Sequence, residues 1–121
     1  MRRFHHISFY HAFQGLKTTF LSQPNLRLHL LAAGIVLMAG IYFQLTRWEW
    51  LILMFTVMWV LVTEMVNTVI EAICDLLTSD YHREVKVAKD VASAMVLVGT
   101  LGAVMVGVVI FLPYLLNWFS L

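Results

Sequence analysis

The sequence predicts an all-α membrane protein in which three transmembrane helices follow an N-terminal amphipathic helix on the membrane surface. Hydrophobic residues make up 61% of the 121 residues, charged residues only 12%, and the mean hydropathy is +0.84. A soluble domain of this length could not bury so much apolar surface. Three apolar runs are each long enough to cross a hydrocarbon core of about 30 Å. We therefore expect residues 1–121 to form a single integral-membrane domain.

The amphipathic surface helix is expected over residues 4–21. Its large apolar side chains fall within about 60° of one another on a helical wheel, and they are Phe9, Phe13, Leu16 and Phe20. Arg2, Arg3 and Lys17 would reach toward anionic head groups, as an interfacial helix requires. The polar segment 22–25, which contains a proline, is expected to end this helix.

The first and second spans are expected over residues 26–45 and about 50–77. A short polar turn separates them and carries two tryptophans, Trp48 and Trp50, which we expect to anchor it at a membrane surface. The second run is longer than the bilayer core requires. Its last turns should therefore emerge among the head groups or into solvent.

The third span is expected over residues 91–112, ending near Pro113. It follows the most densely charged stretch of the chain, 78–90, which we expect to be a loop with Ser79 or Asp80 as the N-cap of the next helix.

Small residues recur at every fourth position of the third span, at Gly99, Ala103 and Gly107. This spacing lets transmembrane helices approach each other closely, so it predicts a packing face.

The distribution of Lys and Arg predicts the orientation in the membrane. Seven of the eight lie in the N-terminal segment, at the start of the first span or in the 78–90 loop, while the opposite turn holds Arg47 alone. Cytoplasmic loops carry such an excess. We expect a multi-pass protein of the inner cell membrane with its N-terminus and the 78–90 loop in the cytoplasm and its C-terminus outside. The formal net charge of +1, with no basic stripe, argues against nucleic acid as a partner.

A stripe of polar residues interrupts the second span at Glu64, Asn67, Glu71 and Asp75. At about 100° per residue these positions fall within roughly 80° of arc. A charged side chain within a span costs about 2.5–3.5 kcal/mol on insertion scales. Three carboxylates on one face therefore predict a functional site.

A second polar face follows on the next helix, where four residues fall within about 100° of arc: Lys86, Lys89, Asp90 and Ser93. Carboxylates and a lysine at the inner membrane surface suit a Mg²⁺ nucleotide. Lys89 would contact phosphate, and Glu64 could accept a proton from a lipid hydroxyl. Two other interpretations stay open: the acids pair to fix helix register, or they relay protons or cations.

The residues of these two faces resemble a known signature. EMVNTVIEAICDLL followed by DYHREVKVAKDVASAMVLV is similar to the motif of the bacterial integral-membrane lipid kinases, the diacylglycerol kinase and undecaprenol kinase family. The resemblance extends across the chain and includes a similar A-F-x-G-L stretch at Ala12–Leu16. It implies a small homotrimer that transfers the ATP γ-phosphate to a lipid hydroxyl with Mg²⁺ and without a P-loop, in agreement with the absence of that motif here.

The resemblance also implies roles for individual residues. Glu64 would be the general base and Glu71 a metal ligand, while Ser93 lies at a lipid-contacting position. The residues implied to shape the phosphate site or to contact the nucleotide are Asn67, Asp75, Asp80, Tyr81, His82, Lys89 and Asp90.

Two features of the N-terminal half bear on metal and substrate. Gln23 stands where the family commonly has a second metal-binding glutamate, and an amide oxygen can coordinate Mg²⁺ but brings no charge. Asn25, Arg27 and His29 either anchor the first span at the interface or contact a lipid head group.

The segment LSQPNLRLHLLAA, and the EW before the second span, look more like the undecaprenol kinase branch than the diacylglycerol kinase branch. We therefore expect undecaprenol as the substrate, with diacylglycerol as the alternative.

Overall fold

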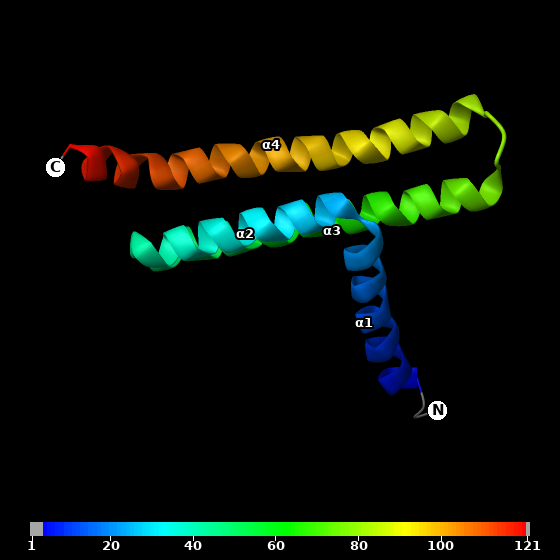
Figure 1. Cartoon of the computed structure of the whole chain (residues 1–121), viewed down its shortest axis with the longest axis horizontal. Helices are drawn as coiled ribbons and strands as arrows, with labels where there is room; N and C mark the ends of the chain where they lie inside the picture. Colours follow the sequence, from blue (N-terminus) through cyan, green and yellow to red (C-terminus); the bar gives the residue numbers. More distant parts are fainter. Residues whose placement is uncertain (1–3, 121) are drawn as a thin grey trace.

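Residues 4–120 are described by a computed structural model, and within them the chain forms four helices. These are α1 (Phe4–Ser22), α2 (Pro24–Tyr42), α3 (Arg47–Leu77) and α4 (Arg83–Phe119). Figure 1 shows α2, α3 and α4 running roughly parallel or antiparallel to one another, with α1 projecting steeply from the start of α2. The predicted all-α architecture is confirmed.

The helices α2, α3 and α4 are long and apolar enough to span a membrane, with 19, 31 and 37 residues. The chain is thus a multi-pass membrane protein with three candidate spans after an N-terminal helix. At 1.5 Å per residue, α3 and α4 extend about 46 Å and 55 Å, well beyond a hydrocarbon core of about 30 Å. Their ends can therefore carry polar chemistry outside the apolar layer.

The apolar stripe of α1 is exposed. Phe9 and Phe13 are 73% and 71% exposed, and Leu16 and Phe20 are also open. The exposed stripe fits the predicted contact with a membrane surface. Lys17 is likewise exposed, while Arg2 and Arg3 lie outside the described residues.

The helix α2 begins where the sequence predicted a break. Gln23 is its N-cap with extended backbone angles, and Pro24 occupies the first helical turn. Proline is favoured there because that position needs no backbone N–H donor.

The end of the bundle near the α2–α3 turn is well packed. Thr46 and Glu49 form a reciprocal capping box that starts α3, and the Tyr114 hydroxyl of α4 donates a 2.8 Å hydrogen bond to Glu49. Trp48 is 73% exposed, as a membrane anchor would be, whereas Trp50 is half-buried and packs closely on Gly40. The expected anchoring of this turn by the two tryptophans stays a prediction.

The predicted charged loop is much shorter than expected. The connection between α3 and α4 covers only residues 78–82, and α4 already includes most of the stretch predicted as loop. The predicted cap at Ser79 or Asp80 is wrong: His82 is the N-cap and makes no side-chain cap bond. The Thr78 hydroxyl instead accepts from the Asp80 amide at 3.0 Å, which closes a turn ahead of the helix.

Pro113 does not end the last helix, contrary to the prediction. It lies inside α4, which continues to Phe119. Proline removes one backbone hydrogen bond to the carbonyl four residues earlier. Transmembrane helices tolerate this loss because local adjustment can satisfy the freed carbonyl.

Candidate functional site

The predicted polar stripe of α3 lies on one side of the helix and becomes more exposed toward the α3–α4 loop. Glu64 and Asn67 are buried at 1% and 6% exposure, and Glu71 is half-buried. The Asp75 side chain is 68% exposed. The stripe thus runs from the buried middle of α3 to the exposed C-terminal end of this helix.

Glu64 is the most deeply buried polar side chain among the described residues. Both of its carboxylate oxygens are buried without a hydrogen-bond partner. The basic side chain that approaches it is the His29 imidazole of α2, whose Nε2 lies 3.8 Å from Glu64 Oε2. Buried polar atoms are nearly always hydrogen-bonded, so this carboxylate has both oxygens available to a further partner.

Asn67 and Glu71 form a pair one turn further along α3. The Asn67 amide donates from Nδ2 to Glu71 Oε1 at 3.2 Å. The amide oxygen of Asn67 is buried and has no partner. A carboxylate and a free amide oxygen therefore lie next to each other, and both are ligand types that Mg²⁺ accepts.

The second polar face, on α4, meets the open end of the α3 stripe. Lys89 Nζ donates to Asp75 Oδ1 at 2.5 Å, which joins the two helices. Lys86 instead pairs with Asp90 on its own helix at 2.5 Å. The predicted meeting of the two polar faces is confirmed by the contact between Lys89 and Asp75.

A cavity of about 410 Å³ lies at this meeting point. It is formed by the ends of α3 and α4 and by the loop between them. Its lining residues are Asp75, Thr78, Ser79, Asp80, Tyr81, His82, Val85, Lys86 and Lys89. Most of the residues expected to contact a nucleotide therefore share one cavity, although Asp90 faces Lys86 and Asn67 lies deeper.

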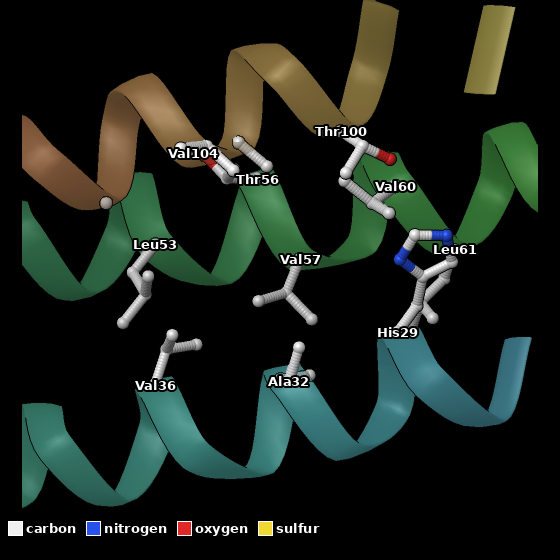
Figure 2. Close-up of a pocket in the computed structure, with 13 residues that line it drawn as sticks. His29, Ala32, Val36, Leu53, Thr56, Val57, Val60, Leu61, Thr100 and Val104 are labelled. Carbon is white, nitrogen blue, oxygen red and sulfur yellow. The ribbon is translucent and has the colours of Figure 1, made fainter. Parts of the chain in front are cut away.

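A second, apolar cavity of about 200 Å³ runs between α2, α3 and α4 (Figure 2). Figure 2 shows Ala32 and Val36 of α2 facing Val57 and Leu53 of α3. Val104 and Thr100 belong to α4, which lies beyond α3 from α2 in this view. His29 lies at one end of this groove and Gly107 contributes to its wall. The groove thus leads from the neighbourhood of Glu64 along the interior of the candidate spans.

Sequence reasoning missed the groove. Gly99 packs as predicted, because an added Cβ would lie 3.4 Å from Thr63 Oγ1. At Gly107 an added Cβ would meet nothing within 4 Å. Ala103 and Gly107 line the groove, so two of the three small residues open a space where close helix packing was expected. The spacing of these small residues was the available signal, but it does not distinguish close helix–helix packing from an open groove.

The remaining predicted site residues are less closely tied to the acids. Gln23 is half-buried at the α1–α2 junction, and Asn25, Arg27 and Ser93 are exposed. Within residues 4–120, no hydrogen bond or ion pair joins these four side chains to the α3 acids. That same part of the chain contains no cluster of three or more His, Cys, Asp or Glu that could hold a metal ion.

Comparison with known proteins decides the family. The profile described as Prokaryotic diacylglycerol kinase matches residues 10–111 of this chain. The chain belongs to the prokaryotic diacylglycerol kinase family. This confirms the resemblance seen in the sequence.

Named relatives within the family fall into two groups. The undecaprenol kinase of Bacillus subtilis is 36% identical over 89% of this chain and 88% of the relative. The diacylglycerol kinase of Synechocystis is 34% identical over 92% of this chain, which spans 64% of that relative's length. The diacylglycerol kinase of Escherichia coli is 28% identical over 78% of this chain and 77% of the relative.

The protein is thus an enzyme, a membrane lipid kinase of the diacylglycerol and undecaprenol kinase type. Membership in a kinase family implies ATP as the phosphate donor and a lipid as the acceptor. It also favours the kinase interpretation of the α3 acids over the proton or cation pathway left open by the sequence.

Proposed function

We propose that this lipid kinase phosphorylates undecaprenol, giving undecaprenyl phosphate. One observation carries the proposal: the partnerless Glu64 carboxylate lies beside His29, which lines one end of an apolar groove. A long, single-chain lipid alcohol could occupy such a groove with its hydroxyl at the carboxylate. The 36% identity to an undecaprenol kinase supports the same substrate.

In the proposed reaction Glu64 is the general base. Its carboxylate accepts the proton of the lipid hydroxyl as the hydroxyl oxygen forms a bond to the γ-phosphorus of ATP. The bond from the γ-phosphorus to the bridging oxygen breaks, and ADP leaves with that oxygen. The burial of Glu64 keeps water away, which favours transfer to the lipid over hydrolysis.

The nucleotide would occupy the cavity at the α3–α4 loop. Lys86 and Lys89 both line it, and ammonium groups bind phosphate as point charges. Lys89 would exchange its bond to Asp75 for one to phosphate, since the Asp75 side chain is largely exposed and can be solvated. Asp80, Tyr81 and His82, in the loop, would contact the rest of the nucleotide, with Asp90 holding Lys86 in place.

The acid and amide groups of α3 fit a magnesium ion that arrives with the nucleotide. Mg²⁺ prefers one or two carboxylates together with phosphate oxygens and water. Glu71 would supply a carboxylate, and the buried Asn67 Oδ1 has no other partner. Gln23 would supply a neutral amide oxygen at the position where the family commonly has an acid. When bound, the ion would neutralise negative charge on the phosphates.

The lipid chain would lie in the groove between α2, α3 and α4. Its lining is almost entirely apolar, as contact with a lipid chain requires. Asn25 and Arg27 lie near the start of α2, and Ser93 lies in the first third of α4. All three side chains are polar and exposed. They would contact the polar end of the lipid at the membrane surface.

We further propose a homotrimer in the inner cell membrane, with the 78–82 loop and the N-terminus in the cytoplasm and the C-terminus outside. The excess of Lys and Arg on one side supports this orientation. An oligomer is supported by the exposed polar side chains of α3 and α4, because a neighbouring protomer could shield them from lipid.

The test is a comparison of two lipid alcohols. The protein in detergent micelles is supplied with γ-labelled ATP, Mg²⁺ and either undecaprenol or diacylglycerol, and labelled lipid is quantified. We expect a kcat/KM for undecaprenol at least about tenfold higher, in line with the similarity of the chain to an undecaprenol kinase. A kcat/KM for diacylglycerol equal to or above that for undecaprenol would overturn the proposed substrate.

A further inference from the structure

We infer that His29 is a positioning residue for Glu64: its imidazole holds one carboxylate oxygen and leaves the other free to accept the proton of the lipid hydroxyl. The inference rests on the proposed role of Glu64 as the base. It goes beyond the sequence expectation, which placed His29 at the interface or at a lipid head group.

The geometry isolates these two side chains from other partners. Within the described residues, His29 is the one basic side chain within 4 Å of the Glu64 carboxylate, with Nε2 at 3.8 Å from Oε2. Their side chains are 18% and 1% exposed. The imidazole comes from α2 and points toward α3, close to Leu61 (Figure 2). The pair therefore joins two helices in a water-poor environment.

A buried base needs an orienting partner. A carboxylate with no hydrogen bonds can rotate, and then neither oxygen has a fixed direction. The side chain that acts as a catalytic base is commonly oriented by a neighbouring polar group. The hydrogen bond between the two is often long before substrate binds. At 3.8 Å the imidazole is one small side-chain movement from a hydrogen bond. With Nε2–H donating to Oε2, Oε1 remains open to the hydroxyl.

Histidine suits this position better than a permanently charged residue. A neutral imidazole offers one N–H donor without adding a full positive charge beside the base. A lysine or arginine there would form a strong ion pair with the carboxylate and weaken it as a base. The imidazole can thus orient Glu64 while its basicity is kept.

The test separates positioning from lipid contact by measuring kcat and both KM values for His29→Ala and His29→Gln. We expect His29→Ala to lower kcat about tenfold or more, with the KM for ATP unchanged. His29→Gln, whose amide can donate to the same oxygen, should recover most of kcat. His11→Ala, an exposed histidine of α1, is the matched control and should behave as wild type. Circular dichroism and gel filtration establish that each variant folds.

A double-mutant cycle with Glu64→Gln tests the link between the two residues. If His29 acts through Glu64, His29→Ala should lower the residual rate of Glu64→Gln by less than about twofold. An equal loss in both backgrounds, or a rise in the KM for lipid with kcat unchanged, would overturn the inference. If Glu64→Gln has no measurable rate, two other results test the inference: whether His29→Ala changes kcat or KM, and whether His29→Gln recovers kcat. Failure of the proposed function is distinct, because it is measured on wild type, which would then phosphorylate diacylglycerol as well as or better than undecaprenol, or phosphorylate neither lipid.

Discussion

At the scale of single residues, the site consists of polar groups that differ mainly in burial. Glu64 is closed off from solvent and has no hydrogen-bond partner, whereas Asp75 is exposed and paired with Lys89. A buried partnerless carboxylate is costly to a folded protein. Such a cost is typical of a residue whose partner is a substrate, while the exposed pair can open without a large penalty.

Lys89 is the residue whose loss should act on the nucleotide alone. Replacing Lys89 with Met removes a positive charge from the cavity while its apolar stem is kept. Because a hydrogen bond to a charged group contributes about 1.5–3 kcal/mol, the KM for ATP should rise about tenfold or more, with a small change in the KM for lipid. Steady-state kinetics with both substrates varied measure this.

Lys17→Met is the matched control, since Lys17 is exposed on α1, far along the chain from the loop cavity. An unchanged KM for ATP in Lys89→Met would contradict the placement of phosphate beside this lysine.

The residue-level prediction from sequence worked where one helix sets the geometry. Glu64, Asn67, Glu71 and Asp75 share a face because the helical repeat alone places them there. The contact between His29 and Glu64 depends on the axial register of α2 relative to α3. That register comes from side-chain packing across two helices, which the repeat does not determine.

At the scale of the elements, the bundle is tightly closed at one end. Trp50 packs against Gly40 of α2, and Tyr114 of α4 bonds to Glu49 of α3. The other end holds the loop cavity and the Lys89–Asp75 contact. The closed end can fix the helices relative to each other while the open end exchanges ligands.

Gly40 should be essential to this closed end. An added Cβ at Gly40 would lie 2.9 Å from the rigid ring of Trp50, so Gly40→Ala should destabilise the protein by about 1–3 kcal/mol. Thermal unfolding in detergent, followed by circular dichroism, should show a melting temperature lower by several degrees.

Gly34→Ala is the control on the same helix, where an added Cβ meets nothing within 4 Å. It should match or slightly exceed wild-type stability because alanine favours helix. Equal melting temperatures for the two variants would contradict the close packing on Trp50.

Element boundaries show where local sequence signals fail. The break before Pro24 was predicted because proline at a helix start is a strong local signal. The start of α4 was not, since Ser79 and Asp80 are good capping residues but Thr78 uses its hydroxyl to form a separate turn. The predicted end of the last span near Pro113 was wrong for a different reason: a long apolar helix can continue past a single missing backbone hydrogen bond.

At the scale of the whole molecule, the arrangement joins two kinds of substrate. The groove lies among the apolar spans, the loop cavity lies at their polar end, and the α3 stripe runs between the two. A lipid and a nucleotide can therefore approach the same carboxylates from different phases. Composition predicted the membrane fold and the acid stripe predicted the polar site, but the groove arises only when three helices are packed together.

The most direct test of the account replaces Glu64 with Gln, which keeps its size and removes the base. Phosphoryl transfer from ATP to undecaprenol is measured for this variant, for wild type and for Glu84→Gln, an exposed glutamate of α4 that serves as control. We expect kcat to fall by about a hundredfold or more in Glu64→Gln, as the loss of a general base predicts, and to stay near wild type in Glu84→Gln. A Glu64→Gln enzyme that is folded and turns over at the wild-type rate would contradict the account.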